Sequence, residues 1–358
     1  MSVWNRSFRI AVALGLASAL LLMVACSPKG SGESGPIQLQ GMGATFPNPL
    51  YQKWVSEYGK LHANIKIDYQ SQGSGAGIKQ IKEQTVDFGA SDAPMKDEDL
   101  KSAPAEILHI PTVLGAVVIT YNLADVAQKL HFAPDVIADI FLGKIKKWND
   151  PRIAADNAGA KLPASDITVV HRSEGSGTSA VFTDYLSKVS PEWKEKVGAG
   201  PSPSWPVGIG GKGNEGVTGQ VKNTPNTIAY VELAYAVQNK LPVAQVKNAN
   251  GTFVEPSIES VTAAAAASAA NTPDDLRVSI TNAPGANVYP ISSYTYILVY
   301  KNQKDATKGK ALIDFLWWGI HDGQSFATPL QYATLPADIV KRAEAKLNSV
   351  TSGGAQLH

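Results

Sequence analysis

The feature that most constrains this chain is a local pattern: a short apolar strand, a glycine-rich turn, and then the first turn of a helix. It is clearest over residues 169–179, which read Val-Val-His-Arg-Ser-Glu-Gly-Ser-Gly-Thr-Ser. The first turn of a helix has unpaired backbone N–H groups and partial positive charge, so it suits an anion. Its glycines let a ligand approach the backbone, and Arg172 offers a planar fork that matches two oxygens of a phosphate or carboxylate. The segment predicts oxyanion binding, with an ordinary Ser/Thr-capped turn as the alternative.

The same pattern recurs near the start of the chain. Strands are expected at 37–41 and 65–70, and each leads through a glycine turn into a segment with helical apolar spacing. The Gly-Ser-Gly turn at 73–75 repeats the one at 175–177, and another short strand places Asp92 just beyond its carboxyl end. In open α/β sheets, ligands bind beyond the carboxyl ends of the strands. We therefore expect these turns to converge on one site.

Two longer β-rich segments suggest how the chain is divided. Residues 107–121 read as one long buried strand, and residues 288–300 mirror them as a second. A chain of 358 residues is long enough for two domains, and the two segments could cross between them. We expect domain I to comprise 37–113 and 292–358, and domain II to comprise 114–291.

The N-terminus reads as a targeting segment rather than part of the fold. A positively charged start precedes an apolar run of 16 residues at 10–25, which suits a secretory signal and is short for a membrane span. Cys26 follows directly and is the only cysteine, so it cannot form an internal disulfide. This resembles a bacterial lipoprotein signal. We expect 1–25 to be a signal peptide and 26–36 a flexible leash lipidated at Cys26, which tethers an exported protein in the periplasm or at the outer face of the membrane.

Composition excludes several other classes of function. The formal net charge is +1, and the chain has no basic stripe and no nucleic-acid-binding motif. Its six histidines are scattered without metal-ligand spacing, so we expect neither a metal nor a cofactor. The letters at 208–213 match the dinucleotide pattern G-x-G-x-x-G. A proline-rich loop at 201–206 precedes them instead of a buried strand, so this motif is rejected.

Four motifs carry a family resemblance. They are Gly-Ala-Thr-Phe-Pro at 43–47, Asp-Phe-Gly-Ala-Ser-Asp-Ala-Pro at 87–94, Gly-Ser-Gly-Thr-Ser at 175–179 and Gly-Lys-Gly-Asn-Glu-Gly-Val at 211–217. With them the chain resembles, over nearly its whole mature length, the substrate-binding protein of the bacterial phosphate-specific ABC transport system. The resemblance implies an α/β, two-domain periplasmic-binding-protein-like fold of type II, with two hinge crossings and a ligand cleft between the domains.

The resemblance also implies a set of phosphate ligands. Carried onto matching positions, they are Thr45, Phe46, Ser74, Asp92, Arg172, Ser176, Gly177 and Thr178, with Phe46 and Gly177 acting through their backbone N–H groups. A carboxylate such as Asp92 repels an anion unless the anion brings a proton to donate. Phosphate brings one and sulfate at neutral pH does not, so Asp92 would select phosphate.

Each of these assignments has a structural alternative. Asp92 could cap a helix at 91–94, Thr45 and Ser74 could serve only as caps, and Arg172 could form a structural salt bridge with Glu174. Many members of the family have aspartate where this chain has Glu174. The longer acid could pair with the arginine differently and change the affinity for phosphate.

The favoured function is therefore a monomeric, lipid-anchored receptor that binds inorganic phosphate and delivers it to an ABC permease and its ATPase; it is not an enzyme. One alternative is a secreted serine hydrolase or phosphatase that uses Ser176, but Gly-Ser-Gly is not the G-x-S-x-G elbow. His171 is adjacent to Arg172 on a strand and should face away from it. The other alternative is a binder of another tetrahedral oxyanion such as sulfate or molybdate, against which Asp92 argues.

Overall fold

The computed structural model describes residues 35–358. The predicted signal peptide 1–25, Cys26 and nearly all of the predicted leash 26–36 lie outside the described residues. Among the helices of 35–358, none is both long and apolar enough to cross a membrane.

The described chain alternates strands and helices, as the sequence pattern predicts. The strands are β1 (Ile37–Gly43), β2 (Ile65–Ser71), β3 (Phe88–Ser91), β4 (Ile107–Asn122), β5 (His131–Phe132), β6 (Thr168–Arg172), β7 (Ile209–Gly211), β8 (Thr227–Glu232), β9 (Gln245–Lys247), β10 (Phe253–Val254), β11 (Ser292–Tyr300), β12 (Thr351–Ser352) and β13 (Ala355–Gln356). The α-helices are α1 (Asn48–Leu61), α2 (Ser74–Lys82), α3 (Asp97–Lys101), α4 (Pro134–Phe141), α5 (Pro151–Ala155), α6 (Gly177–Val189), α7 (Pro191–Lys196), α8 (Gly213–Asn223), α9 (Leu233–Gln238), α10 (Ile258–Ser268), α11 (Ala306–Ile320) and α12 (Ala337–Asn348). Short 3₁₀ turns are η1 (Ala269–Asn271), η2 (Asp322–Phe326) and η3 (Thr328–Leu330).

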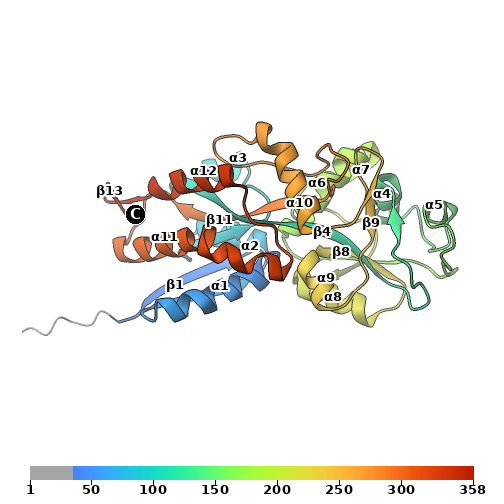
Figure 1. Cartoon of the computed structure of the whole chain (residues 1–358), viewed down its shortest axis with the longest axis horizontal. Coiled ribbons are helices and arrows are strands. Elements are labelled where there is room, and N and C mark those ends of the chain that lie inside the picture. Colours follow the sequence, from blue (N-terminus) through green and yellow to red (C-terminus); the bar gives the residue numbers. More distant parts are fainter. Residues whose placement is uncertain (1–34) are drawn as a thin grey trace, which may run out of the picture. The chain divides into compact units, whose positions relative to one another are not determined.

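The large sheet has the strand order β2-β1-β3-β11-β4-β8-β6-β7. At one end β1 pairs in parallel with β2 and β3, and at the other end β6 pairs in parallel with β7 and β8. In the middle, β11 is antiparallel to both β3 and β4, and β4 is antiparallel to β8. We call β1–β3 with α1, α2 and α11 the first half, and β6–β8 with α6, α8 and α9 the second half (Figure 1).

The long strand β4 joins the two halves and orients them. Its first part, 107–116, pairs with β11, and its second part, 117–122, pairs with β8. Because β3 runs in the same direction as β4 and β8 runs against it, the strands of the two halves point toward each other. Their carboxyl ends, where ligands bind in open α/β sheets, therefore face one another across the middle of β4.

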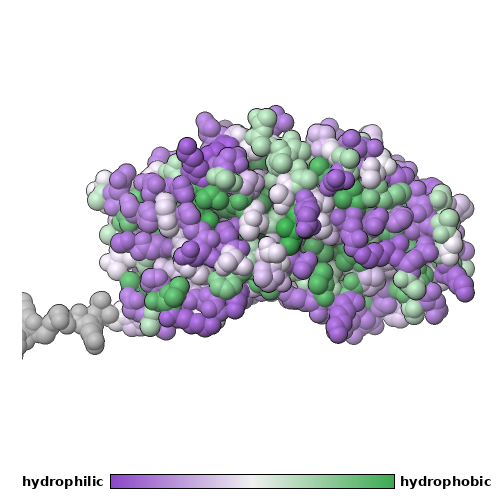
Figure 2. Space-filling model, viewed as in Figure 1, coloured by the Kyte–Doolittle hydropathy of each residue, from purple (hydrophilic) through white to green (hydrophobic). Residues whose placement is uncertain are grey.

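The central strands form the core of the molecule. Every residue of β11 is buried, as is every residue of β4 except its last. This is the near-continuous apolar pattern expected of strands that are covered on both faces. Polar residues cover most of the face shown in Figure 2, with apolar residues in separate patches. The expected α/β fold is confirmed.

The sequence predicts β4 correctly, but the strand it predicts at the position of β11 is too long. The strand expected at 107–121 is β4, but the segment expected at 288–300 becomes a strand only at Ser292. The reason is local: Pro290 has no N–H to donate, and the N–H of Tyr289 donates to the Ser260 carbonyl instead of a neighbouring strand. The rejected motif at 208–213 contains β7, and the proline-rich segment 201–206 before it is not a strand. The domain boundaries remain a prediction.

Candidate functional site

The predicted turns converge at the middle of β4. Thr45 lies between β1 and α1, Ser74 begins α2, Asp92 follows β3, and Arg172 ends β6. The side chains predicted to bind an anion are all buried: Thr45, Ser74, Asp92, Arg172, Ser176 and Thr178. Contacts between the halves hold the turns together, since the Gly75 N–H donates to the Gly175 carbonyl at 2.9 Å. The structure thus assembles the predicted residues, and their role as phosphate ligands remains a prediction.

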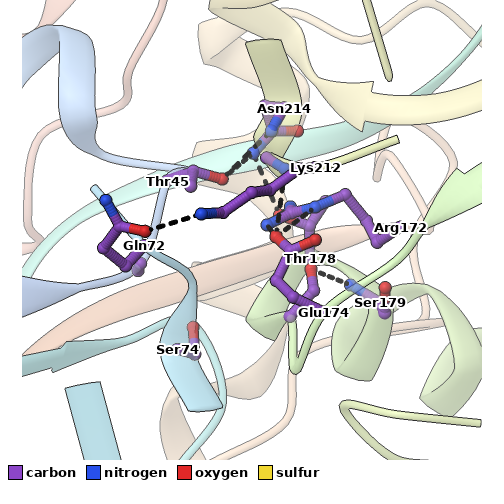
Figure 3. A network of polar contacts seen from close by, with 12 residues as sticks. Thr45, Gln72, Ser74, Arg172, Glu174, Thr178, Ser179, Lys212 and Asn214 are labelled. Carbon is purple, nitrogen blue, oxygen red and sulfur yellow. Dashed lines mark hydrogen bonds and ion pairs between the residues drawn. The ribbon is translucent and has the colours of Figure 1, made fainter. Parts of the chain in front are cut away.

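Arg172 lies beneath the site with its side chain only 1% exposed. Its Nε and Nη2 donate to Glu174 Oε1, the former at 2.9 Å, and its Nη1 donates to Thr178 Oγ1 at 3.2 Å (Figure 3). A guanidinium has five N–H donors. Three are used in these bonds within residues 35–358, which leaves two for a ligand. The predicted salt bridge with Glu174 is therefore present, and it leaves N–H donors of the Arg172 guanidinium available to a ligand.

Glu174 is placed by more than the arginine. Its Oε1 also accepts the Gly213 N–H at 3.1 Å, which ties the β6–α6 turn to the start of α8. Its Oε2 is buried without a partner in the described part of the chain. Glu174 thus binds the Nε and Nη2 atoms of Arg172, whereas the Nη1 atom points toward Thr178.

Asp92 is a fully buried carboxyl group in the same site. Its Oδ1 accepts from Thr295 Oγ1 at 2.9 Å, and its Oδ2 is 3.5 Å from Ser74 Oγ. Burial raises its pKa from the usual 3.8 to about 7, opposed by the hydrogen bond from Thr295 and the charge of Arg172. The next helix, α3, begins only at Asp97 and has no side-chain cap. The alternative that Asp92 caps a helix is therefore wrong.

The hydroxyl groups of the site play different parts. Thr45 does not cap α1 and Ser74 does not cap α2, so the capping-only alternative is wrong for both. Ser176 does cap α6, because its Oγ accepts the Ser179 N–H at 3.0 Å. Since a hydroxyl can accept and donate at the same time, Ser176 keeps a proton that it can donate to a ligand.

Two backbone N–H groups complete the predicted donor set. Those of Phe46 and Gly177 have no hydrogen-bond acceptor among residues 35–358. Gly177 is also required for space: a Cβ there would lie 2.3 Å from Ser74 Oγ and 2.6 Å from Asp92 Oδ2. Glycine lets the start of α6 approach the opposite half this closely.

His171 takes no part in the site. Its ring stacks on Trp205 with 4.9 Å between the ring centroids, and its Nδ1 lies 2.9 Å from the Arg172 carbonyl oxygen. Burial lowers the pKa of this imidazole. The ring faces away from the Arg172 guanidinium, as predicted, and is not aligned as a base for Ser176.

Sequence reasoning missed several residues of the site. Tyr235 donates to the Thr45 carbonyl at 2.6 Å across the two halves. Lys212 also donates across them, to Gln72 Oε1 at 2.9 Å (Figure 3). Asn214 is fully buried between Thr45 and Thr178. The motif at 211–217 pointed to this segment without giving Asn214 a role.

A second acid, Glu232, ends β8 next to the site and was also missed. Its Oε2 accepts from the Ala234 N–H and from the Tyr332 hydroxyl, while its Oε1 has no partner within 35–358. Burial raises its pKa well above the usual value, and the nearby Asp92 adds to the shift. Burial thus disfavours a second negative charge beside the anion site.

A cavity of about 230 Å³ adjoins the site. Ser74, Asp92 and Gly177 of the site are among the residues that line it, together with apolar side chains such as Ile78 and Val181. Within the described residues, no group of three or more His, Cys, Asp or Glu side chains could hold a metal ion.

Known proteins resemble this chain over most of its length. A family model described as the PBP superfamily domain matches residues 30–317. The chain is 48% identical over 309 residues to the phosphate-binding protein PstS of Pasteurella multocida, covering 86% of this chain and 89% of that protein.

Solved structures show the same fold at low sequence identity. A high affinity periplasmic phosphate-binding protein bound with phosphate (PfluDING) matches with a TM-score of 0.67 at 22% identity, covering 86% of this chain and 93% of that one. An ABC-type phosphate transport receptor from Vibrio cholerae matches with a TM-score of 0.55 at 16% identity, covering 83% and 100%. The chain belongs to the PBP superfamily and, within it, to the family of PstS phosphate-binding proteins.

Proposed function

We propose that this chain binds inorganic phosphate and delivers it to an ABC permease for import. Its relatives are named phosphate-binding proteins, and a structure of the same fold holds phosphate. The proposed ligands are the eight residues predicted above: Thr45, Phe46, Ser74, Asp92, Arg172, Ser176, Gly177 and Thr178. They supply hydroxyl and backbone donors, two free N–H groups of Arg172, and one carboxyl group.

The observation that favours phosphate in particular is the buried Asp92 in the same site as Arg172. Above its pKa of about 7, Asp92 is a carboxylate that can accept a hydrogen bond from the hydroxyl group of hydrogen phosphate. Sulfate has no proton at this pH, so its oxygens would face an unpaired acceptor in a dry site. A buried unsatisfied group of this kind costs about 1–3 kcal/mol. The alternative of a sulfate binder is therefore disfavoured.

The hydrolase alternative is also not favoured. Ser176 Oγ caps α6, and its neighbour His171 faces away from the site. The relatives are named as binding proteins. The chain acts as the solute-binding component of the transporter rather than as an enzyme.

Equilibrium dialysis at pH 8 with labelled phosphate and excess unlabelled sulfate tests the function. Phosphate should remain bound, and Arg172→Ala should weaken binding most among single variants. Asp92→Asn should let sulfate compete, because an amide can donate to its oxygens. Sulfate that displaces phosphate from the wild-type chain at comparable concentration would refute the role of Asp92.

We also propose that the chain is exported and held at the membrane by a lipid on Cys26, as a monomer. The apolar run at 10–25 followed directly by the only cysteine supports this. One diacyl anchor on a flexible leash would keep the phosphate site outside the cytoplasm and close to the permease. Palmitate labelling of cells should mark the wild-type chain and not Cys26→Ala.

A further inference from the structure

We propose that Asn214 is a positioning residue that locks the hydroxyl groups of Thr45 and Thr178 as donors toward the bound anion. The inference rests on the proposed function of the same site and assigns a role to a residue outside the predicted ligand set. Asn214 is the second residue of α8 and is fully buried. It lies between one proposed ligand from each half of the molecule.

The amide of Asn214 reaches both threonines. Its Nδ2 donates to Thr45 Oγ1 at 2.8 Å and to Thr178 Oγ1 at 3.2 Å (Figure 3). Its backbone N–H donates a second bond to Thr45 Oγ1, also at 3.2 Å. The start of α8 therefore contacts Thr45, which belongs to the opposite half.

The orientation of this amide is fixed by its other end. Asn214 Oδ1 accepts the backbone N–H of Glu232 at 2.9 Å. An amide oxygen can only accept and an amide nitrogen can only donate. Because the oxygen must face the Glu232 N–H, the nitrogen must face the two hydroxyl groups.

The bonds that the Thr45 and Thr178 hydroxyl groups accept determine where their protons can point. A hydroxyl group has one proton and two acceptor lone pairs. Thr45 Oγ1 accepts twice from Asn214, and Thr178 Oγ1 accepts once from Asn214 and once from Arg172 Nη1. With their lone pairs occupied, both groups can only donate further, and neither proton has an acceptor within 35–358. Two aligned donors, one from each half, are thus left for the oxygens of an anion.

While the two halves are together, this arrangement orders the donors even without the ligand. A free hydroxyl group rotates and can present a lone pair, which an anion would repel. Fixing the rotation in advance removes part of the ordering cost of binding. Asn214 would therefore raise the affinity for phosphate without touching it.

The most direct test is Asn214→Asp. The variant keeps the shape of the side chain and an oxygen that accepts from the Glu232 N–H, and it removes the NH₂ donors. The new carboxylate oxygen would accept the two hydroxyl protons and draw them away from the anion. Dialysis at pH 8 should show phosphate binding at least about tenfold weaker, consistent with two lost hydrogen bonds. Asn223→Asp makes the same change at the exposed end of α8 and should leave affinity unchanged.

A double-mutant cycle separates positioning from a general effect on the fold. Asn214→Ala, which adds no charge, should weaken phosphate binding about tenfold in the wild-type chain. In a Thr45→Val/Thr178→Val background the same change should cost less than about twofold, because no hydroxyl remains to be oriented. An equal loss in both backgrounds would overturn the inference, and so would an Asn214→Asp variant with wild-type affinity. A folded wild-type chain that fails to bind phosphate would instead refute the proposed function itself.

Discussion

Asp92 shows at the scale of one residue how burial changes what a carboxyl group can do. In water it would be ionised throughout the neutral range, whereas burial brings its pKa to about 7. Arg172 and the hydroxyl of Thr295 oppose this shift. A group that gains or loses its proton near neutral pH is suited to share one with phosphate, whose own protonation changes in the same range.

The raised pKa predicts how stability depends on pH. The folded, phosphate-free chain keeps the Asp92 proton up to about pH 7, whereas the unfolded chain releases it near 3.8. The unfolded state therefore binds fewer protons between these values, so the contribution of Asp92 to stability falls as pH rises and levels off above 7. A shift of this size corresponds to at most about 4 kcal/mol.

Urea unfolding of the phosphate-free protein at pH 5 and pH 8 measures this effect. Asp92→Asn should be more stable than the wild-type chain at pH 8, and the difference should shrink at pH 5. Asp68→Asn, at an exposed position on β2, is the control and should give the same difference at both values. Parallel pH dependence in wild type and Asp92→Asn would contradict the prediction.

At the scale of elements, the site depends on how closely the turns approach each other. The turn before α2 and the turn before α6 meet through Gly75 and Gly175, and Gly177 lies against Ser74 and Asp92. These contacts join elements of opposite halves. A methyl group at Gly177 would therefore act on the site rather than on the core of either half.

Gly177→Ala should reduce phosphate affinity by at least about tenfold while the chain remains folded. The added Cβ would lie 2.3 Å from Ser74 Oγ, so the halves would have to separate to accommodate it. Gly219→Ala is the matched control, because a Cβ there meets nothing within 4 Å and alanine favours the helix by about 1 kcal/mol. Dialysis of both variants measures their phosphate affinity, and thermal unfolding shows whether they remain folded. Normal phosphate binding by Gly177→Ala would show that the turns are not so tightly apposed.

The sequence predicts these elements well and their partners poorly. Strands, glycine turns and helix starts depend on local spacing, so β4 and the turns around Thr45, Ser74 and Arg172 could be predicted. Asn214 and Thr295 could not, since they contact Thr45 and Asp92 across 169 and 203 residues of chain. No periodicity or motif spacing encodes such a distance. The buried acid Glu232 was missed for the same reason, because its partner Tyr332 lies 100 residues away.

At the scale of the whole molecule, two opposed sets of parallel strands place half of the donors on each side. β4 and the return of the chain into β11 link the two halves through the sheet. Around the site, hydrogen bonds join them further, from Tyr235 to Thr45 and from Lys212 to Gln72. An anion that bridges donors of both halves can bind well only when they are together, so it should stabilise this arrangement.

Small-angle scattering should therefore show the chain becoming more compact when phosphate is added. Polar bonds such as Lys212 to Gln72 contribute little net stability in water, so the phosphate-free chain should also populate a more open form. Arg172→Ala, measured at the same phosphate concentration, should not contract, because it loses the charged fork on one side of the cleft. If the wild-type radius of gyration stays constant while dialysis shows bound phosphate, the halves are already closed without the anion. Phosphate would then have to enter a preformed site through local motion, and the cavity lined by Asp92 adjoins that site.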